Sequence, residues 1–242
     1  MTVIDQAEAP PPATMPLTAH LAELRNRILW CVLAIAVGGS VGFAFGEQII
    51  TLLRGALPSD VRLIQIELGD GFSIRLQISF VVGVILAMPV ILWHLWRFIA
   101  PGLTAGEQRA ILPWIPMALV FFAVGVVVAY IVLPYAALFL LQFVPEAVDR
   151  TINIRSYFEF MSSLFLAFGI LMEYPIVLVA LSRVGIITSE RLRRSRGVAL
   201  LGLFAFSAIV TPGGDFVSPG ILTVVLFLLY EGTTLFIRRT GR

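Results

Sequence analysis

Long runs of apolar residues, separated by short segments rich in proline, glycine or charge, dominate this chain. Six runs lie at about 28–46, 74–96, 111–134, 158–182, 198–210 and 220–237. A bilayer hydrocarbon core about 30 Å thick needs roughly 20 apolar residues for each helical span. The pattern therefore predicts an all-α, polytopic membrane protein with six transmembrane helices.

The last two runs are shorter than the others, and several runs contain proline. Residues 198–210 reach only about 20 Å as a helix, at a rise of 1.5 Å per residue. We therefore expect the last two helices to be short and the adjacent bilayer to thin. Proline removes a backbone donor and favours a kink, so kinked helices and a concave bundle are expected from Pro89, Pro113, Pro116, Pro134 and Pro175.

The segments around the first run predict three further features. Residues 1–16 are rich in Pro and Ala and are expected to form a disordered cytoplasmic tail. The transmembrane domain then spans 17–239, and 240–242 end the chain as a cytoplasmic tail. Residues 47–53 have the apolar spacing of a short helix in the outer membrane interface. The glycines within 38–42 are expected to allow close helix packing.

Composition supports a membrane protein and offers little for catalysis. The chain is 59% hydrophobic and 13% charged, whereas soluble domains are about half apolar and about a quarter charged. The single cysteine, Cys31, excludes an internal disulfide, and the two histidines form no HExxH motif. The residues show no catalytic constellation, so we do not expect an intramembrane protease, a metalloenzyme or another enzyme.

The basic residues are distributed unevenly, and all 17 of them are arginine. With the N-terminus inside, twelve arginines fall in cytoplasmic segments against four or five outside. The positive-inside rule therefore predicts that both termini lie in the cytoplasm, an N-in, C-in topology. The run at 190–196 would contact anionic lipid head groups, and we interpret it mainly as a topology anchor.

Three acidic residues are candidates for function. Glu173 lies midway along the fourth run, where a carboxylate is costly and should face a partner or a watery groove. The alternative is a protonated or hydrogen-bonded group that joins helices. Glu23 could bind a cationic ligand or simply pair with Arg27 one turn later. Glu107, in a short cytoplasmic loop, would by itself be an ordinary exposed acid.

Four motifs together resemble the TatC family, over about residues 17–239. They are HLAELRNR at 20–27, WRFIAPGL at 96–103 followed by Glu107, AFG at 167–169 leading to EYP at 173–175, and TP at 211–212 followed by Asp215. The resemblance implies a receptor subunit of the twin-arginine translocase, which exports folded proteins across the bacterial inner membrane using the proton-motive force.

The resemblance also implies particular residues and partners. Signal-peptide binding falls to the positions of Glu23, Phe98 and Glu107, while Glu173, Thr211 and Asp215 are candidate polar sites for a partner or groove. The implied partners are the single-span subunits TatA and TatB, twin-arginine signal peptides and membrane lipid, with a possible homo-oligomer. No nucleic acid and no cofactor are implied.

The residues favour carboxylates as partners of the two signal arginines, because guanidinium groups form bidentate pairs with them. The turn at 211–219 is one residue longer than the common family form, which weakens the assignment of partner contacts there. Two other functions stay open. A six-span secondary solute transporter would show substrate flux without protein cargo, and a passive scaffold would tolerate replacement of Glu107 and Glu173.

Overall fold

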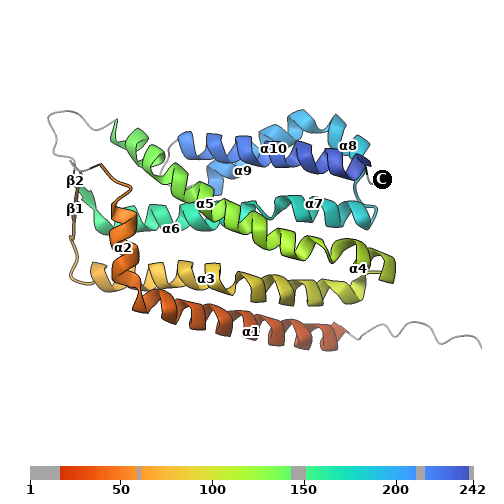
Figure 1. Ribbon diagram of the computed structural model, residues 1–242, viewed down its shortest axis with the longest axis horizontal. Coiled ribbons are helices and arrows are strands. Elements are labelled where there is room, and N and C mark those ends of the chain that lie inside the picture. The colour runs from red at the N-terminus through yellow and green to blue at the C-terminus, as the bar shows by residue number, and fades with distance from the viewer. Residues whose placement is uncertain (1–16, 59–60, 143–150, 211–215, 240–242) are drawn as a thin grey trace, which may run out of the picture.

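The computed structural model describes residues 17–58, 61–142, 151–210 and 216–239 of the chain. In chain order the elements are α1 (Leu17–Ala44), α2 (Gly46–Arg54), β1 (Arg62–Ile64), α3 (Asp70–Ile99), the 3-10 turn η1 (Ala100–Gly102), α4 (Ala105–Ile111), α5 (Trp114–Leu141), β2 (Thr151–Asn153), α6 (Ile154–Leu171), α7 (Tyr174–Arg183), α8 (Ser189–Arg194), α9 (Arg196–Val210) and α10 (Val217–Arg239). The long helices run roughly side by side (Figure 1).

Within the described residues, five helical segments are long and apolar enough to cross a membrane: His20–Ala44, Asp70–Gly102, Ala105–Leu141, Ile154–Arg183 and Val217–Arg239. The sixth predicted span corresponds to α9, a shorter apolar helix of 15 residues. The expectation of a short last helix is wrong, because α10 has 23 residues. Its ends carry polar residues such as Ser218 and Arg239, which lie outside the apolar run.

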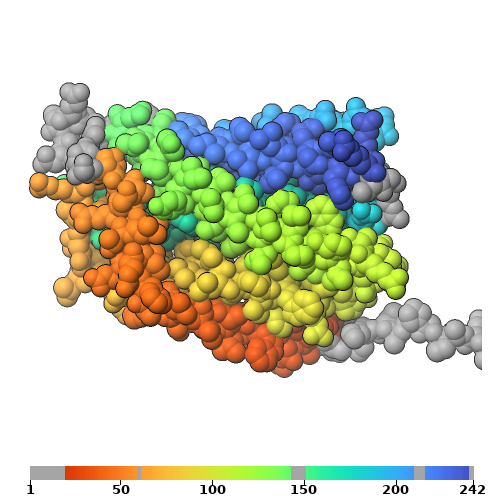
Figure 2. Space-filling view, in the orientation of Figure 1, coloured from red at the N-terminus to blue at the C-terminus, as the bar shows by residue number. Residues whose placement is uncertain are grey.

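Glycine brings α1 and α3 into close contact, as the cluster at 38–42 predicted. A Cβ atom added to Gly83 of α3 would lie 2.5 Å from the carbonyl oxygen of Ile35 on α1. One added to Gly38 would lie 3.0 Å from the carbonyl oxygen of Gly83. The two helices therefore pack backbone against backbone. Figure 2 shows one face of the molecule, with α1, α3, α5 and α10 in order from red to blue.

Proline affects the helices in two ways. Pro89 and Pro134 lie inside the continuous helices α3 and α5. Pro175 instead follows a break, because α6 ends at Leu171 and α7 begins at Tyr174 with proline in its first turn. A proline there removes a donor that a helix start does not use. The break falls within one membrane-length segment and places Glu173 at the junction.

A small cap, made of α2 and the two strands, covers one end of the bundle (Figure 1, left). Helix α2 confirms the predicted short helix at 47–53. Strands β1 and β2 pair in parallel, with Arg62 opposite Thr151, and no pattern in the sequence predicted them. The Tyr157 hydroxyl donates to the Leu53 carbonyl oxygen at 2.8 Å, which fixes α2 against α6.

The core lies where α6 packs against α3 and α5. Its fully buried side chains include Ile74, Leu133, Phe158 and Phe168, while Leu222 and Leu226 extend it to α10. Many outward-facing apolar side chains remain exposed, for example Trp30 and Leu33 of α1. Such exposure over whole helices is expected where lipid replaces water as the surrounding solvent.

Arginine collects at the end opposite the cap. We call this the arginine-rich end: the start of α1, the end of α3, α4, the end of α7, α8, the start of α9 and the end of α10 (Figure 1, right). Each of these elements carries arginine there, for example Arg25, Arg97, Arg109 and Arg238. The uneven charge seen in the sequence is thus an asymmetry in space.

Candidate functional site

The candidate signal-peptide residues all lie on elements of the arginine-rich end. Glu23 is in the second turn of α1, Phe98 is next to the last residue of α3, and Glu107 is on α4. The turn η1 joins α3 to α4, so Phe98 and Glu107 are connected through a compact segment. The Gln108 side chain holds this segment by donating to the carbonyl oxygens of Ala100 at 2.7 Å and Leu103 at 3.1 Å.

Glu23 forms the intrahelical pair that the sequence offered as its alternative. Arg27 donates to Glu23 Oε1 through Nε at 3.1 Å and also through a terminal guanidinium nitrogen. The same guanidinium reaches the His94 carbonyl oxygen of α3 at 3.5 Å. Glu23 Oε2 is 4.0 Å from His20 Nδ1. One carboxylate oxygen is thus bound by Arg27, and the other faces His20.

A stack of the His20 and Phe98 rings lies beside Glu23. The rings of His20 and Phe98 lie 4.4 Å apart between centroids, with an interplanar angle of 17°. This stack connects α1 and α3 at their ends and sets an aromatic surface beside the carboxylate. The structure therefore brings Glu23 and Phe98 together through His20, which the sequence marks only as part of the motif at 20–27.

Glu107 is held by a capping box at the start of α4. Its Oε2 accepts hydrogen bonds from the backbone nitrogen and the hydroxyl of Thr104, both at 2.8 Å. In return, the Glu107 backbone nitrogen donates to Thr104 Oγ1 at 3.4 Å. The pattern Thr-x-x-Glu at 104–107 could have revealed this cap in the sequence. The cap fixes the carboxylate in position at a helix end that is partly exposed.

Glu173 lies at the break between α6 and α7, away from the arginine-rich end. It is half-buried, and its Oε1 is a buried atom with no hydrogen-bond partner among the described residues. Its neighbours Leu171 and Tyr174 line a cavity of about 330 Å³ that also borders Leu203 and Leu226. One oxygen of the Glu173 carboxyl group is thus buried without a hydrogen bond, close to residues that line an apolar cavity between helices.

The other two predicted site residues, Thr211 and Asp215, lie between α9 and α10 in the chain, outside the described residues.

Across the described ranges, no cluster of His, Cys, Asp and Glu side chains could hold a metal ion. The carboxylates at the arginine-rich end are suited to binding cationic groups, because a carboxylate accepts the fork of hydrogen bonds that guanidinium donates.

Comparison with known proteins gives one consistent result. Residues 19–224 match the family model described as Sec-independent protein translocase protein (TatC). A protein of that name from Listeria innocua is 38% identical over 221 residues, which cover 90% of this chain and 89% of the relative. The TatC protein of Escherichia coli K12 is 35% identical over 90% of this chain and 86% of its own length.

Solved structures agree with the sequence comparisons. A crystal structure of the twin-arginine translocase receptor TatC in the detergent DDM matches with a TM-score of 0.78 and 35% identity. The match covers 90% of this chain and 99% of that structure. A second crystal structure of this receptor matches with a TM-score of 0.77 and 33% identity. The similarity thus extends over nearly the whole described fold.

Proposed function

The chain belongs to the TatC family of Sec-independent protein translocase proteins, and from this premise we propose that it binds the twin-arginine signal peptides of folded cargo proteins. As a TatC protein it is a multi-pass membrane subunit of a protein transport system and not an enzyme. The proposed binding site is formed by Glu107 and Glu23, with the Phe98 ring beside them.

The arrangement of the two carboxylates carries this proposal. Glu107 is held in position by its capping box, so little side-chain freedom is lost when a guanidinium binds. Glu23 Oε1 is bound by Arg27, which leaves Oε2, on the side of His20, to accept a hydrogen bond from an incoming arginine. The stacked ring of Phe98 supplies apolar contact for the rest of the peptide.

We propose six membrane spans with both termini in the cytoplasm of a bacterial cell. The arginine-rich end holds the start of α1 and the end of α10 (Figure 1), which fits an even number of crossings. Five long segments and the short α9 give six. The positive-inside rule assigns the arginine-rich end to the cytoplasm, the side from which cargo leaves.

Partners of this chain are also part of the proposal. TatA-like and TatB-like single-span subunits would complete the complex, with export driven by the proton-motive force. Glu173, together with Thr211 and Asp215, would present polar groups to these partners or to a groove. An unpartnered carboxyl oxygen at a helix break supports this role for Glu173.

Binding of a synthetic signal peptide to the purified, detergent-solubilised chain tests the proposal. The Glu107→Gln variant is informative because glutamine also forms a capping box and therefore preserves α4 while removing the negative charge. We expect its affinity for a twin-arginine peptide to fall by roughly tenfold or more, because hydrogen bonds to charged groups contribute about 1.5–3 kcal/mol. Export of a reporter protein should fall in parallel.

The control is Glu190→Gln, which removes an exposed acid on α8 at the same end of the bundle. It should leave peptide affinity unchanged. A peptide with lysines in place of the two arginines should bind wild type more weakly, because an ammonium group lacks the planar fork. Wild-type affinity in Glu107→Gln would contradict the assignment of this carboxylate.

A further inference from the structure

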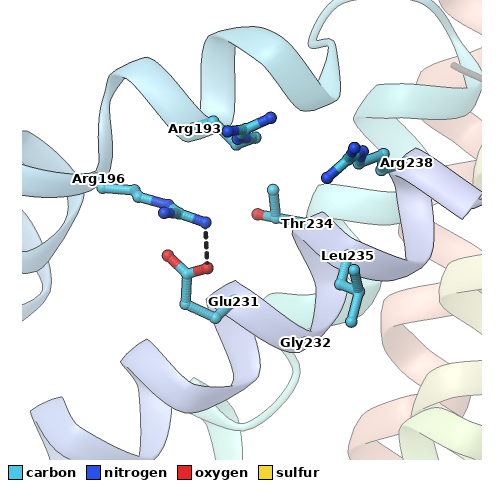
Figure 3. A pocket seen from close by; sticks show the side chains of 7 residues that line it. All are labelled: Arg193, Arg196, Glu231, Gly232, Thr234, Leu235 and Arg238. Atoms are coloured by element: carbon cyan, nitrogen blue, oxygen red, sulfur yellow. Dashed lines mark hydrogen bonds and ion pairs between the residues drawn. The ribbon is translucent and has the colours of Figure 1, made fainter.

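A second charged site lies at the arginine-rich end, between α8, the start of α9 and the last turns of α10. It is a cavity of about 300 Å³ whose charged lining residues are Arg193, Arg196, Glu231 and Arg238. Figure 3 shows these side chains around a common space, with the guanidinium groups of Arg193 and Arg238 turned toward it. None of them is among the signal-peptide candidates.

The side chains that line this cavity carry a net positive charge. Arg196 donates to Glu231 Oε2 at 2.6 Å, and this pair neutralises itself. Arg193 and Arg238 form no hydrogen bond or ion pair with any part of the chain that the structure describes. Two unpaired guanidinium groups beside one cavity repel each other, and an anion between them relieves that repulsion.

A buried hydroxyl in the same cavity also lacks a partner. Thr234 is only 2% exposed, and its Oγ1 has no hydrogen-bond partner within the described ranges. Thr223 on the same helix shows the usual arrangement, since its hydroxyl donates to the Pro219 carbonyl oxygen at 2.6 Å. A buried hydroxyl left without a bond costs free energy, so the Thr234 hydroxyl is suited to donate to an acceptor on a bound ligand.

An apolar stripe on α10 leads away from the charged end of the cavity. Leu228 is 66% exposed and Leu235 is 48% exposed. They lie seven residues apart on one helix face, and Glu231 and Arg238 follow at helical spacing on that face. Because α10 is a membrane-length segment that ends at Arg239, this stripe runs from head-group depth into the hydrocarbon layer.

We propose that the cavity binds the phosphate of an anionic phospholipid head group. Arg193 and Arg238 make the charged contacts, Thr234 donates its hydroxyl to a phosphate oxygen, and an acyl chain lies along Leu235 and Leu228. Several oxygen acceptors on one group match the arginine donors, and the adjoining apolar stripe favours a lipid over free phosphate. This site does not depend on signal-peptide binding.

Native mass spectrometry of the full chain in detergent, titrated with phosphatidylglycerol, tests the site. The double variant Arg193→Gln/Arg238→Gln should bind this lipid roughly tenfold or more weakly, because each arginine near an anionic head group contributes about fivefold. The matched control is Arg191→Gln/Arg239→Gln, which removes the same charge from the same two helices outside the cavity lining. It should bind nearly as wild type.

Two single variants test the geometry and remain available if the double variant does not fold. Thr234→Val keeps the shape of the side chain and removes the hydroxyl, so lipid affinity should fall severalfold while the thermal midpoint is kept or rises. Glu231→Gln removes the competing acid and should increase affinity. Unchanged affinity in both variants would overturn the site.

Other outcomes would also overturn it. Equal losses in the two double variants would show general attraction to charge instead of a built site. Equal binding of zwitterionic phosphatidylcholine would show that net charge is not recognised. Displacement of the lipid by an equal concentration of inorganic phosphate would identify free phosphate as the ligand.

Discussion

Glu173 has a buried carboxyl oxygen that accepts no hydrogen bond from the described residues. In an isolated chain this arrangement is unfavourable, because an unsatisfied buried polar group costs about 1–3 kcal/mol. A residue that lowers stability in this way is expected to act when another group reaches it, for example a polar side chain of a partner helix. Stability and function should then respond in opposite directions to its replacement.

Replacement of Glu173 by leucine should therefore raise the thermal midpoint of the purified chain and lower export of a reporter. Glu173→Gln keeps hydrogen-bonding capacity and should change both quantities less. Thermal unfolding in detergent and an export assay in cells measure the two effects. Unaltered export in Glu173→Leu would show that the carboxyl group has no part in transport.

The sequence identified candidate site residues but not all of the contacts between them. The resemblance singled out Glu23, and its spacing offered a pair with Arg27, which the structure confirms; that the other carboxylate oxygen faces His20 is visible only in the structure. The stack of His20 on Phe98 was not predicted. These residues are far apart in the sequence, and their contact depends on the register of α1 against α3, which no local pattern specifies.

Glycine residues of both helices lie at the contact between α1 and α3. Their glycines allow the backbones to approach closely, and this contact positions His20 and Phe98 at the arginine-rich end. In a bilayer, close packing of this kind replaces the hydrophobic drive that holds helices together in water. The geometry of the candidate site thus depends on a contact along the whole helix pair.

The variant Gly83→Ala tests that dependence. Its Cβ would lie 2.5 Å from the Ile35 carbonyl oxygen and must push α1 away. Overpacking typically costs about 1–3 kcal/mol, so we expect a lower thermal midpoint and weaker signal-peptide binding. The control Gly71→Ala lies on the same helix, where an added Cβ meets nothing within 4 Å, and it should fold at least as well as wild type. Equal stability of the two variants would contradict this account.

The elements themselves were largely readable from hydrophobic runs. The positions of the long helices and of α2 followed from apolar spacing, and the break before Pro175 lies at a proline that the sequence marked. The length of helix α10 was underestimated because both ends of the helix contain polar residues. Strands β1 and β2 have three residues each and pair over a long sequence separation, so local periodicity could not identify them.

The distribution of arginine gives the whole molecule a direction. The cap of α2, β1 and β2 lies at one end, and the arginine-rich elements lie at the other (Figure 1). Anionic lipid and the insertion machinery favour arginine on the cytoplasmic side. The proposed signal-peptide site and the proposed lipid site would then both face the cytoplasm.

Single-cysteine labelling checks this orientation after Cys31, the one native cysteine, is replaced by alanine. Leu68, which is fully exposed beside the cap, and Ser195, which is exposed between α8 and α9, are each changed to cysteine in separate variants. A membrane-impermeant maleimide should label Leu68→Cys in intact spheroplasts and Ser195→Cys only after permeabilisation. The reverse pattern would overturn the N-in, C-in topology.

The parallel pair of β1 and β2 also constrains the order of assembly. Strand β1 follows α2, but its partner residues, such as Thr151 opposite Arg62, come after α3, α4 and α5. During synthesis the two strands can therefore pair only after α3, α4 and α5 have been made. The pair closes the loop that contains α3, α4 and α5, and so joins the two ends of this stretch of chain at the cap.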